Sequence, residues 1–201
     1  MRPAGVVLAG GANRRFGRLK GLESIGGVRI IDRVANSIRA VTTVDILAAN
    51  DESASDWLHG VSVESDKFPS TGGLAGVHAA LSRGSDVLVV AWDMPFVVPK
   101  LLQAIVDRAV SGNAQVVVPE SRSPSGIEPF CAFYSVETLS AIEAFLAAGG
   151  GAAYGFLRAN PGTIRLSLRD VVSIGDPDRL FFSVNTPEDL EHARTMAGDA
   201  E

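Results

Sequence analysis

The sequence predicts an α/β fold, built as one domain around a mainly parallel β-sheet. Short apolar runs rich in Val, Ile and Leu alternate with segments of helical apolar periodicity along the chain. One of these runs is apolar without any alternation, which is typical of a central strand that is covered on both faces. The 201 residues fit one domain, and the hydrophobic share of 46% is that of a well-packed globular protein.

Strands are predicted where short apolar runs end in turn-forming residues. They are expected at residues 6–9, 44–48, 61–63, 87–91, 116–119, 130–134, 164–168 and 181–184. Helices are predicted between them because their apolar residues recur every three or four positions. They are expected at residues 30–41, 53–58, 74–81, 99–110, 138–148 and 154–159, and a last helix starts at Pro187 with Thr186 as its N-cap.

Composition and charge exclude several classes of function. A net charge of −5 disfavours general nucleic-acid binding. The single cysteine, Cys131, excludes an internal disulfide and a multi-cysteine metal site, and the three histidines show no ligand spacing. No secretory signal is recognisable, and no apolar run approaches the ~18 residues of a membrane span. The expected location is therefore the cytoplasm.

The stretch from residue 6 to residue 20 leads from a strand into a basic loop that contains glycines. Gly10 and Gly11 interrupt the apolar run, and backbone N–H groups can approach an anion closely where side chains are absent. Positive charge comes from Arg14, Arg15, Arg18 and Lys20. The sequence therefore predicts a phosphate-binding loop at the end of the first strand.

Two common phosphate-binding loops do not fit this stretch. A P-loop requires Lys-Ser or Lys-Thr after its second glycine, whereas Lys20 lies between Leu19 and Gly21. The dinucleotide fingerprint requires Gly-x-Gly-x-x-Gly. Here Gly10 and Gly11 are adjacent, and the next glycine is Gly17. Both a P-loop and a dinucleotide site are therefore disfavoured.

An aspartate follows the clearest strand, at residues 87–91. Ligands of open α/β sheets bind at the carboxyl ends of the strands, so Asp93 is expected at the same edge as the phosphate loop. Mg²⁺ typically takes one or two protein carboxylates together with substrate phosphates. Taken alone, Asp93 is better interpreted as a turn or capping residue before Pro95. Beside a phosphate loop it becomes a candidate Mg²⁺ ligand.

The glycine loop also resembles the signature of a known enzyme family. Leu8 to Gly11 reads Leu-Ala-Gly-Gly, and Arg15, Gly17 and Lys20 follow at the positions found in nucleotidyltransferases. Within that superfamily the segment is most similar to the molybdenum cofactor guanylyltransferases. Asp93-Met-Pro likewise resembles their metal-binding Asp-x-Pro, whereas Leu19 departs from the Asp that members often carry.

Further segments resemble the same family in the same order, so that the resemblance covers residues 5 to about 195. They are Asn50, Asp66, Gly72 to Gly76, Pro129 to Tyr134, and Asn185 to Leu190. Ser183 departs from the pattern, because an Asn often occupies that place. The resemblance implies a three-layer α/β/α sandwich with a mostly parallel, Rossmann-like sheet of the nucleotide-diphospho-sugar transferase type. It also implies one domain over residues 1–201, with a nucleotide-binding half at 1–110 and an acceptor-binding half at 111–197.

The activity implied by the resemblance is transfer of GMP from GTP to the phosphate of molybdopterin or its molybdenum form, with release of pyrophosphate. The implied cofactor is Mg²⁺, and the implied partners are GTP, molybdopterin and proteins of molybdenum cofactor synthesis or use. Arg15, Lys20 and Asp93 are the implied catalytic residues, with Asp93 as the metal ligand. The implied nucleotide contacts are Leu8, Ala9, Gly10, Gly11, Lys20, Asn50, Asp66, Gly72 and Gly73, and the acceptor contact is Asn185.

Several alternatives stay open at the level of sequence. The same chemistry could use CTP with the same pterin, or a sugar phosphate as acceptor. A non-catalytic nucleotide-binding module could keep the loop, although Asp93 together with Lys20 argues against it. Asn185 could be a simple turn residue before a capped helix. Trp92 could stack on a ligand, although packing is the commoner role beside a central strand.

Overall fold

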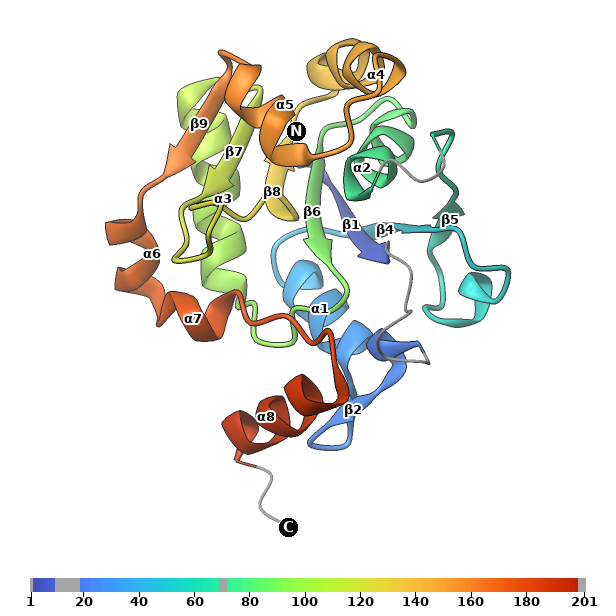
Figure 1. Ribbon diagram of the computed structural model, residues 1–201, viewed down its shortest axis with the longest axis vertical. Coiled ribbons are helices and arrows are strands. Elements are labelled where there is room, and N and C mark those ends of the chain that lie inside the picture. Colours follow the sequence, from blue (N-terminus) through green and yellow to red (C-terminus); the bar gives the residue numbers. More distant parts are fainter. Residues whose placement is uncertain (1, 10–18, 69–71, 199–201) are drawn as a thin grey trace.

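The computed structural model describes residues 2–9, 19–68 and 72–198, and a seven-stranded sheet lies at its centre (Figure 1). The strands lie side by side in the order β5-β4-β1-β6-β8-β7-β9. They are β1 (Ala4–Ala9), β4 (Val44–Ala49), β5 (Ser62–Glu64), β6 (Val87–Ala91), β7 (Val116–Pro119), β8 (Cys131–Tyr134) and β9 (Thr163–Leu166). Only β8 runs antiparallel to its two neighbours, so the sheet is mostly parallel, as predicted.

Helices cover both faces of the sheet and complete the predicted three layers (Figure 1). One face packs against α1 (Ile30–Arg39) and α3 (Pro99–Gly112). The other packs against α2 (Gly73–Leu81), α4 (Leu139–Ala147) and α5 (Ala153–Ala159). The remaining helical elements of the described residues are the 3-10 turns η1 (Lys20–Leu22), η2 (Ala54–Asp56) and η3 (Val136–Thr138), and the helices α6 (Leu168–Ile174), α7 (Pro177–Leu180) and α8 (Pro187–Ala197).

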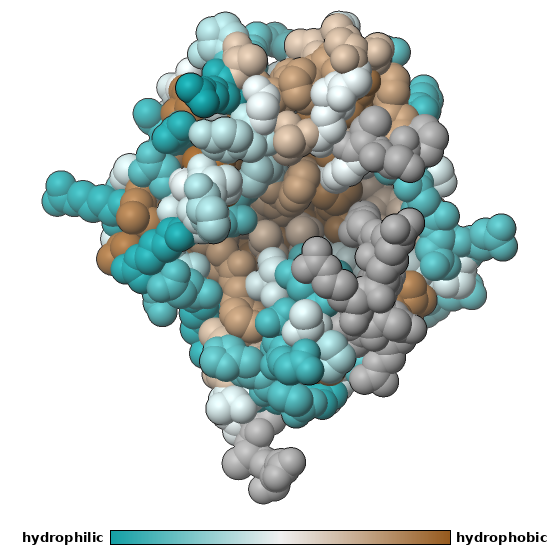
Figure 2. All heavy atoms as spheres, viewed as in Figure 1, coloured by the Kyte–Doolittle hydropathy of each residue, from teal (hydrophilic) through white to brown (hydrophobic). Residues whose placement is uncertain are grey.

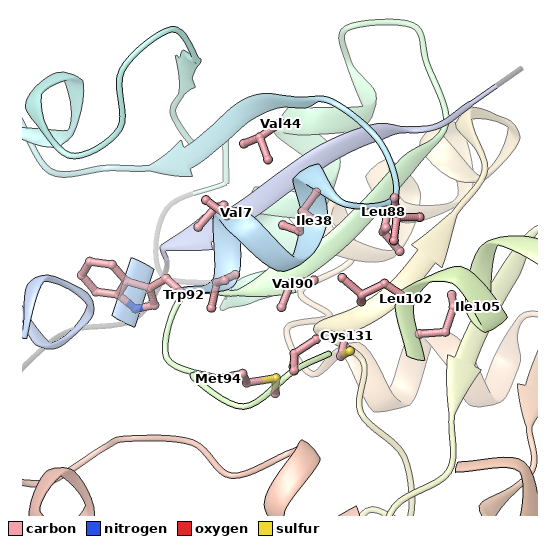
Figure 3. Close-up of a cluster of buried hydrophobic side chains, with 14 of the residues drawn as sticks. Val7, Ile38, Val44, Leu88, Val90, Trp92, Met94, Leu102, Ile105 and Cys131 are labelled. Carbon is pink, nitrogen blue, oxygen red and sulfur yellow. The ribbon is translucent and has the colours of Figure 1, made fainter. Parts of the chain in front are cut away.

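The apolar residues of the central strands fill two cores, one on each face of the sheet. Along β6, Leu88 and Val90 face the core beneath α1 and α3, and Val87 and Val89 face the other core. All four are completely buried, which explains why this strand shows no alternation in the sequence. Figure 3 shows the first of these cores, with Trp92 at one end of the labelled cluster and Leu102 and Ile105 toward the other.

The predicted strand at residues 181–184 is wrong. The chain there leaves α7 and runs without strand structure to α8. The Phe181 and Phe182 N–H groups donate to the carbonyls of Pro177 and Arg179, and the Val184 N–H donates to the Asp93 carbonyl, so these groups do not pair with a strand. Phe181 and Val184 are buried by packing against neighbouring elements, and an apolar run of that length does not distinguish packing from strand pairing.

A small β-hairpin not expected from the sequence follows η1. Its strands are β2 (Ser24–Ile25) and β3 (Val28–Arg29), and the turn residues Gly26 and Gly27 both have positive φ. Helix α8 packs on this hairpin, and Arg194 Nε donates a hydrogen bond to the Ser24 carbonyl at 3.3 Å. The C-terminal helix therefore supports the chain segment that follows Lys20.

The predicted start of the last helix is confirmed by a capping box. The Thr186 side chain accepts a hydrogen bond from the Asp189 N–H, and the Asp189 carboxylate accepts one from the Thr186 N–H. Replacing Thr186 by Ala is expected to lower the free energy of unfolding by about 1 kcal/mol, because one N-cap acceptor is lost. Chemical denaturation would measure this, and Thr186→Ser, which keeps the hydroxyl, should stay close to wild type. An equal loss in both variants would contradict the cap assignment.

Candidate active site

The carboxyl ends of β1, β4 and β6 meet at one edge of the sheet, and the predicted site residues follow them. In the register of the sheet Ala9 lies opposite Ala49, and Leu8 lies opposite Ala91. The Trp92 N–H donates to the Leu8 carbonyl at 3.0 Å, which continues the pairing one residue beyond β6. Asp93 is therefore placed beside the exit of β1, where the phosphate loop was predicted.

Lys20, Asp93 and Asn185 form one hydrogen-bonded cluster at this edge. Lys20 Nζ lies 2.5 Å from Asp93 Oδ2 and 2.7 Å from Asn185 Oδ1. The Lys20 and Asp93 side chains are only 11% and 15% exposed, so little water screens the ion pair. Residues separated by 73 and 165 positions in the sequence are thus brought to one ammonium group.

Asn185 is held in this cluster by the start of α8. Its N–H donates to Asp189 Oδ2 at 2.9 Å, and the preceding Val184 N–H donates to the Asp93 carbonyl at 2.9 Å. The segment before α8 is therefore tied to the turn after β6 through its backbone, and the capping box aligns the Asn185 amide. Asn185 is therefore held beside Lys20, and its role toward the acceptor stays a prediction.

Asn50 and Asp66 form a second polar pair next to β1. Asn50 Nδ2 donates to Asp66 Oδ2 at 2.9 Å, and the Asp66 N–H donates to Asn50 Oδ1 at 2.8 Å. Burial raises the pKa of the Asp66 carboxyl above its ordinary value, while the Asn50 hydrogen bond and the nearby His78 oppose the rise. The pair follows β4 and β5, so two residues that the family resemblance implies as nucleotide contacts are brought together.

The glycines at the start of α2 allow a close approach of the chain. Gly72 has a φ of 84°, a left-handed conformation that other residues rarely adopt. A Cβ on Gly73 would lie 2.6 Å from the Phe130 ring, and one on Gly76 would overlap the Leu8 side chain. Helix α2 can therefore lie directly against β1 and the strand that starts at Cys131, which brings its N-terminus to the site edge.

Glu128 is a carboxylate that the sequence analysis did not select. It precedes the strand β8, and it lies near enough to Asp93 to be affected by the Asp93 charge. Burial raises the pKa of the Glu128 carboxyl, the Ser121 and Ser123 hydroxyls oppose the rise, and the Asp93 charge adds to it. The signal in the sequence was an acid at the end of a polar segment, which does not by itself distinguish a site residue.

Some predicted residues lie outside the part of the chain that the structure describes. These are Gly10, Gly11, Arg14, Arg15, Gly17 and Arg18. Their roles as phosphate contacts, and that of Arg15 in catalysis, stay predictions. Cys131 is fully buried in the core, where burial raises the pKa of its thiol, so it takes no part in the site.

The described residues contain no group of three or more His, Cys, Asp or Glu side chains that could enclose a metal ion. Asp93 nevertheless fits a magnesium site of the open kind, in which one protein carboxylate shares the ion with substrate phosphates and water. Asp93 already accepts a cation, the Lys20 ammonium, at 2.5 Å.

In residues 2–9, 19–68 and 72–198, none of the helices is long and apolar enough to cross a membrane.

Comparison with known proteins gives one consistent assignment. Residues 5–163 match the family model described as the MobA-like NTP transferase domain. The chain is 35% identical to a probable molybdenum cofactor guanylyltransferase of Pelotomaculum thermopropionicum, over 98% of this chain and 94% of the relative.

Two solved structures share the fold. Molybdopterin-guanine dinucleotide biosynthesis protein A from Archaeoglobus fulgidus superposes with a TM-score of 0.82 at 24% identity, over 98% of this chain and 100% of its own. Rv0371C from Mycobacterium tuberculosis H37Rv, in complex with manganese, has a TM-score of 0.65 at 18% identity, over 96% of this chain and 98% of its own. The chain therefore belongs to the MobA-like NTP transferase family and is a nucleotidyltransferase.

Proposed function

We propose that this enzyme transfers GMP from GTP to the terminal phosphate of molybdopterin or its molybdenum form and releases pyrophosphate. The observation that carries the proposal is the cluster of Lys20, Asp93 and Asn185, which lies at the same sheet edge as the Asn50–Asp66 pair. The first group suits a triphosphate and the second suits a base. The relative from Pelotomaculum thermopropionicum, which spans nearly the whole chain, supports the same assignment.

The reaction requires no general base on the protein. The attacking group is a phosphate monoester whose second pKa is ~6, so it is largely ionised at neutral pH. Its oxygen attacks the α-phosphorus of GTP, the bond to the β-phosphate oxygen breaks, and pyrophosphate leaves with the electron pair. The work left to the protein is alignment of the two phosphates and neutralisation of their charge.

Lys20 and Asp93 supply this neutralisation in different ways. The Lys20 ammonium and the Arg15 guanidinium are proposed to donate hydrogen bonds to the departing phosphates. Asp93 would hold a Mg²⁺ ion, which when bound neutralises negative charge on the phosphate oxygens. The manganese complex of Rv0371C supports a divalent cation in this fold.

Selection of guanine is assigned to the Asn50–Asp66 pair. Guanine presents an N–H group and an amino group side by side, and a carboxylate is an acceptor-only partner for both donors. Asp66→Asn is expected to weaken GTP binding by about tenfold, because one acceptor oxygen becomes an amino donor facing another donor. Calorimetric titration with GTP and CTP would measure this, with Asp51→Asn, an exposed aspartate bonded to Ser53, as the control. Equal weakening for both nucleotides would contradict a role in base selection.

The acceptor is proposed to bind in the half formed by residues 111–197, close to Asn185. Figure 2 shows that the viewed face is hollowed at its centre and that apolar residues gather in the hollow. A flat heteroaromatic pterin suits an apolar hollow, while its phosphate would reach the polar edge.

Proteins of molybdenum cofactor synthesis or use would deliver and receive the pterin. The cytoplasm is the proposed location of the enzyme.

One experiment separates this proposal from its competitors. Pyrophosphate release would be measured with GTP, CTP and UTP in turn, each with Mg²⁺ and with either molybdopterin or a sugar phosphate as the acceptor. We expect release with GTP. A preference for CTP would indicate a cytidylyltransferase, and release only with a sugar phosphate would indicate a different acceptor. Nucleotide binding without release under any acceptor would indicate a non-catalytic module.

A further inference from the structure

Trp92 lies next to Asp93 and contacts the backbone beside Lys20, although the proposed mechanism gives it no contact with a substrate. It follows β6 directly, precedes Asp93, and is 1% exposed. Its backbone N–H is bonded to Leu8 at the end of β1. The Trp92 backbone is therefore held between the end of β1, where the predicted phosphate loop begins, and Asp93, which pairs with Lys20.

The backbone of Gly21, next to Lys20, packs against the face of the Trp92 indole. A Cβ placed on Gly21 would lie 2.6 Å from Trp92 Cδ2 and 2.9 Å from Cζ3, and still closer to Cε3. Real Cβ atoms do not approach other atoms so closely, so only glycine allows this turn to rest on the ring. Gly21 is not among the glycines with positive φ, so its backbone conformation does not itself require glycine. The requirement comes from contact with Trp92.

A second tryptophan holds the first. The rings of Trp57 and Trp92 stack with centroids 5.1 Å apart and an interplanar angle of 18°. Trp57 Nε1 donates to Ser53 Oγ at 3.1 Å, and Arg29 donates to the Trp57 carbonyl at 3.0 Å. The orientation of Trp92 is thus set by the loop after β4, whereas Trp92 Nε1 has no hydrogen-bond partner among the residues that the structure describes.

We propose that Trp92 is a positioning residue for Lys20. The indole packs against the backbone of the turn at Lys20 and Gly21. This contact holds the turn where the Lys20 ammonium reaches Asp93 and Asn185. A lysine side chain has many rotamers. When its backbone is already held in place by packing, less conformational entropy is lost on binding of the ammonium to a phosphate. The consequence for nucleotide binding rests on the proposed function, but the position of Lys20 can be tested without any nucleotide.

The first test measures how accessible the Lys20 amine is. Lys20, Lys67 and Lys100 are all the lysines of the sequence, so brief acetylation of the native protein followed by peptide mapping gives three rates. In the wild type Lys20 should react most slowly, because it is buried and paired while the other two are exposed. In Trp92→Leu and in Gly21→Ala the Lys20 rate should rise by at least about fivefold relative to Lys100, the factor expected for loss of one hydrogen bond.

Leu102→Ala is the matched control for loss of stability. Leu102 is fully buried in the same core as Trp92, and Figure 3 shows it well away from the tryptophan. Its truncation should lower the melting temperature without raising the Lys20 rate. An unchanged Lys20 rate in folded Gly21→Ala, or an equal rise in Leu102→Ala, would overturn the proposal. Gly21→Ala keeps the test decisive if Trp92→Leu does not fold.

The second test asks whether Trp92 acts through Lys20. Trp92→Leu should weaken GTP binding by about tenfold in the protein with Lys20, but by less than about twofold in the Lys20→Met background. The same factor in both backgrounds would show that Trp92 acts independently of Lys20 and would overturn the proposal. If the enzyme prefers another nucleoside triphosphate, the cycle is run with that nucleotide; the guanylyl assignment then fails by itself.

Discussion

Asp93→Asn is expected to lower the rate of pyrophosphate release by at least about 10²-fold at a fixed Mg²⁺ concentration. The change removes the negative charge that would bind the cation and leaves a side chain of the same shape. Half-saturation should also move to much higher Mg²⁺, because a neutral amide is a weak ligand for a hard cation. Rates measured over a series of Mg²⁺ concentrations, after treatment with a chelator, give both quantities.

The same variant also leaves Lys20 without its counter-ion. Removing one partner of a poorly solvated ion pair destabilises a protein, so the melting temperature must be recorded alongside the rate. Asp107→Asn is the control, since Asp107 is an exposed aspartate on α3 that accepts from Gln103. If folded Asp93→Asn kept full Mg²⁺-dependent release, the mechanism proposed here would be wrong.

Lys20→Met is expected to lower kcat by on the order of 10²-fold or more, because it removes a cation aimed at the departing phosphates. Methionine keeps most of the apolar stem, so packing is largely preserved. Affinity for GTP should fall less than kcat, since charge on the leaving group grows as the reaction proceeds. Single-turnover kinetics with saturating GTP would separate binding from the chemical step.

A matched substitution tests whether charge alone explains the effect of Lys20→Met. Lys100→Met changes the net charge by the same amount, and Lys100 is exposed on α3, where it lines a surface hollow with Ala40 and Asp107. Its kcat should stay near the wild-type value. A loss of similar size in both variants would mean that the overall charge of the protein, and not the ammonium beside Asp93, controls the reaction.

Much of the fold was predictable because it depends on local sequence. The apolar run of β6 indicates a central strand, and the Thr186-Pro187 step with Asp189 indicates a helix start, whatever surrounds them. The prediction failed at residues 181–184, where an apolar run packs without pairing. It also missed the hairpin at Ser24–Arg29, whose strands of two residues each are too short for periodicity to reveal.

The candidate site was predictable only as a set of residue types in the right order. Lys20, Asp93 and Asn185 were each predicted as site residues, but no local pattern indicates that one ammonium contacts both of the others. The same holds for Asn50 and Asp66, which pair through two hydrogen bonds. Glu128 was not selected, because its closeness to Asp93 results from the antiparallel insertion of β8 beside β6.

The class of fold, the family resemblance and the chemical groups available to the reaction follow from the sequence alone, because strand runs, helix caps and glycine loops are encoded over a few residues. The tertiary structure decided which of those groups meet. The sheet order brings three strand ends to one edge, α8 returns Asn185 to Asp93, and the Trp92 ring fixes the turn that carries Lys20. Contacts across 73 and 165 residues depend on the packing of whole elements, which no local pattern in the chain can specify.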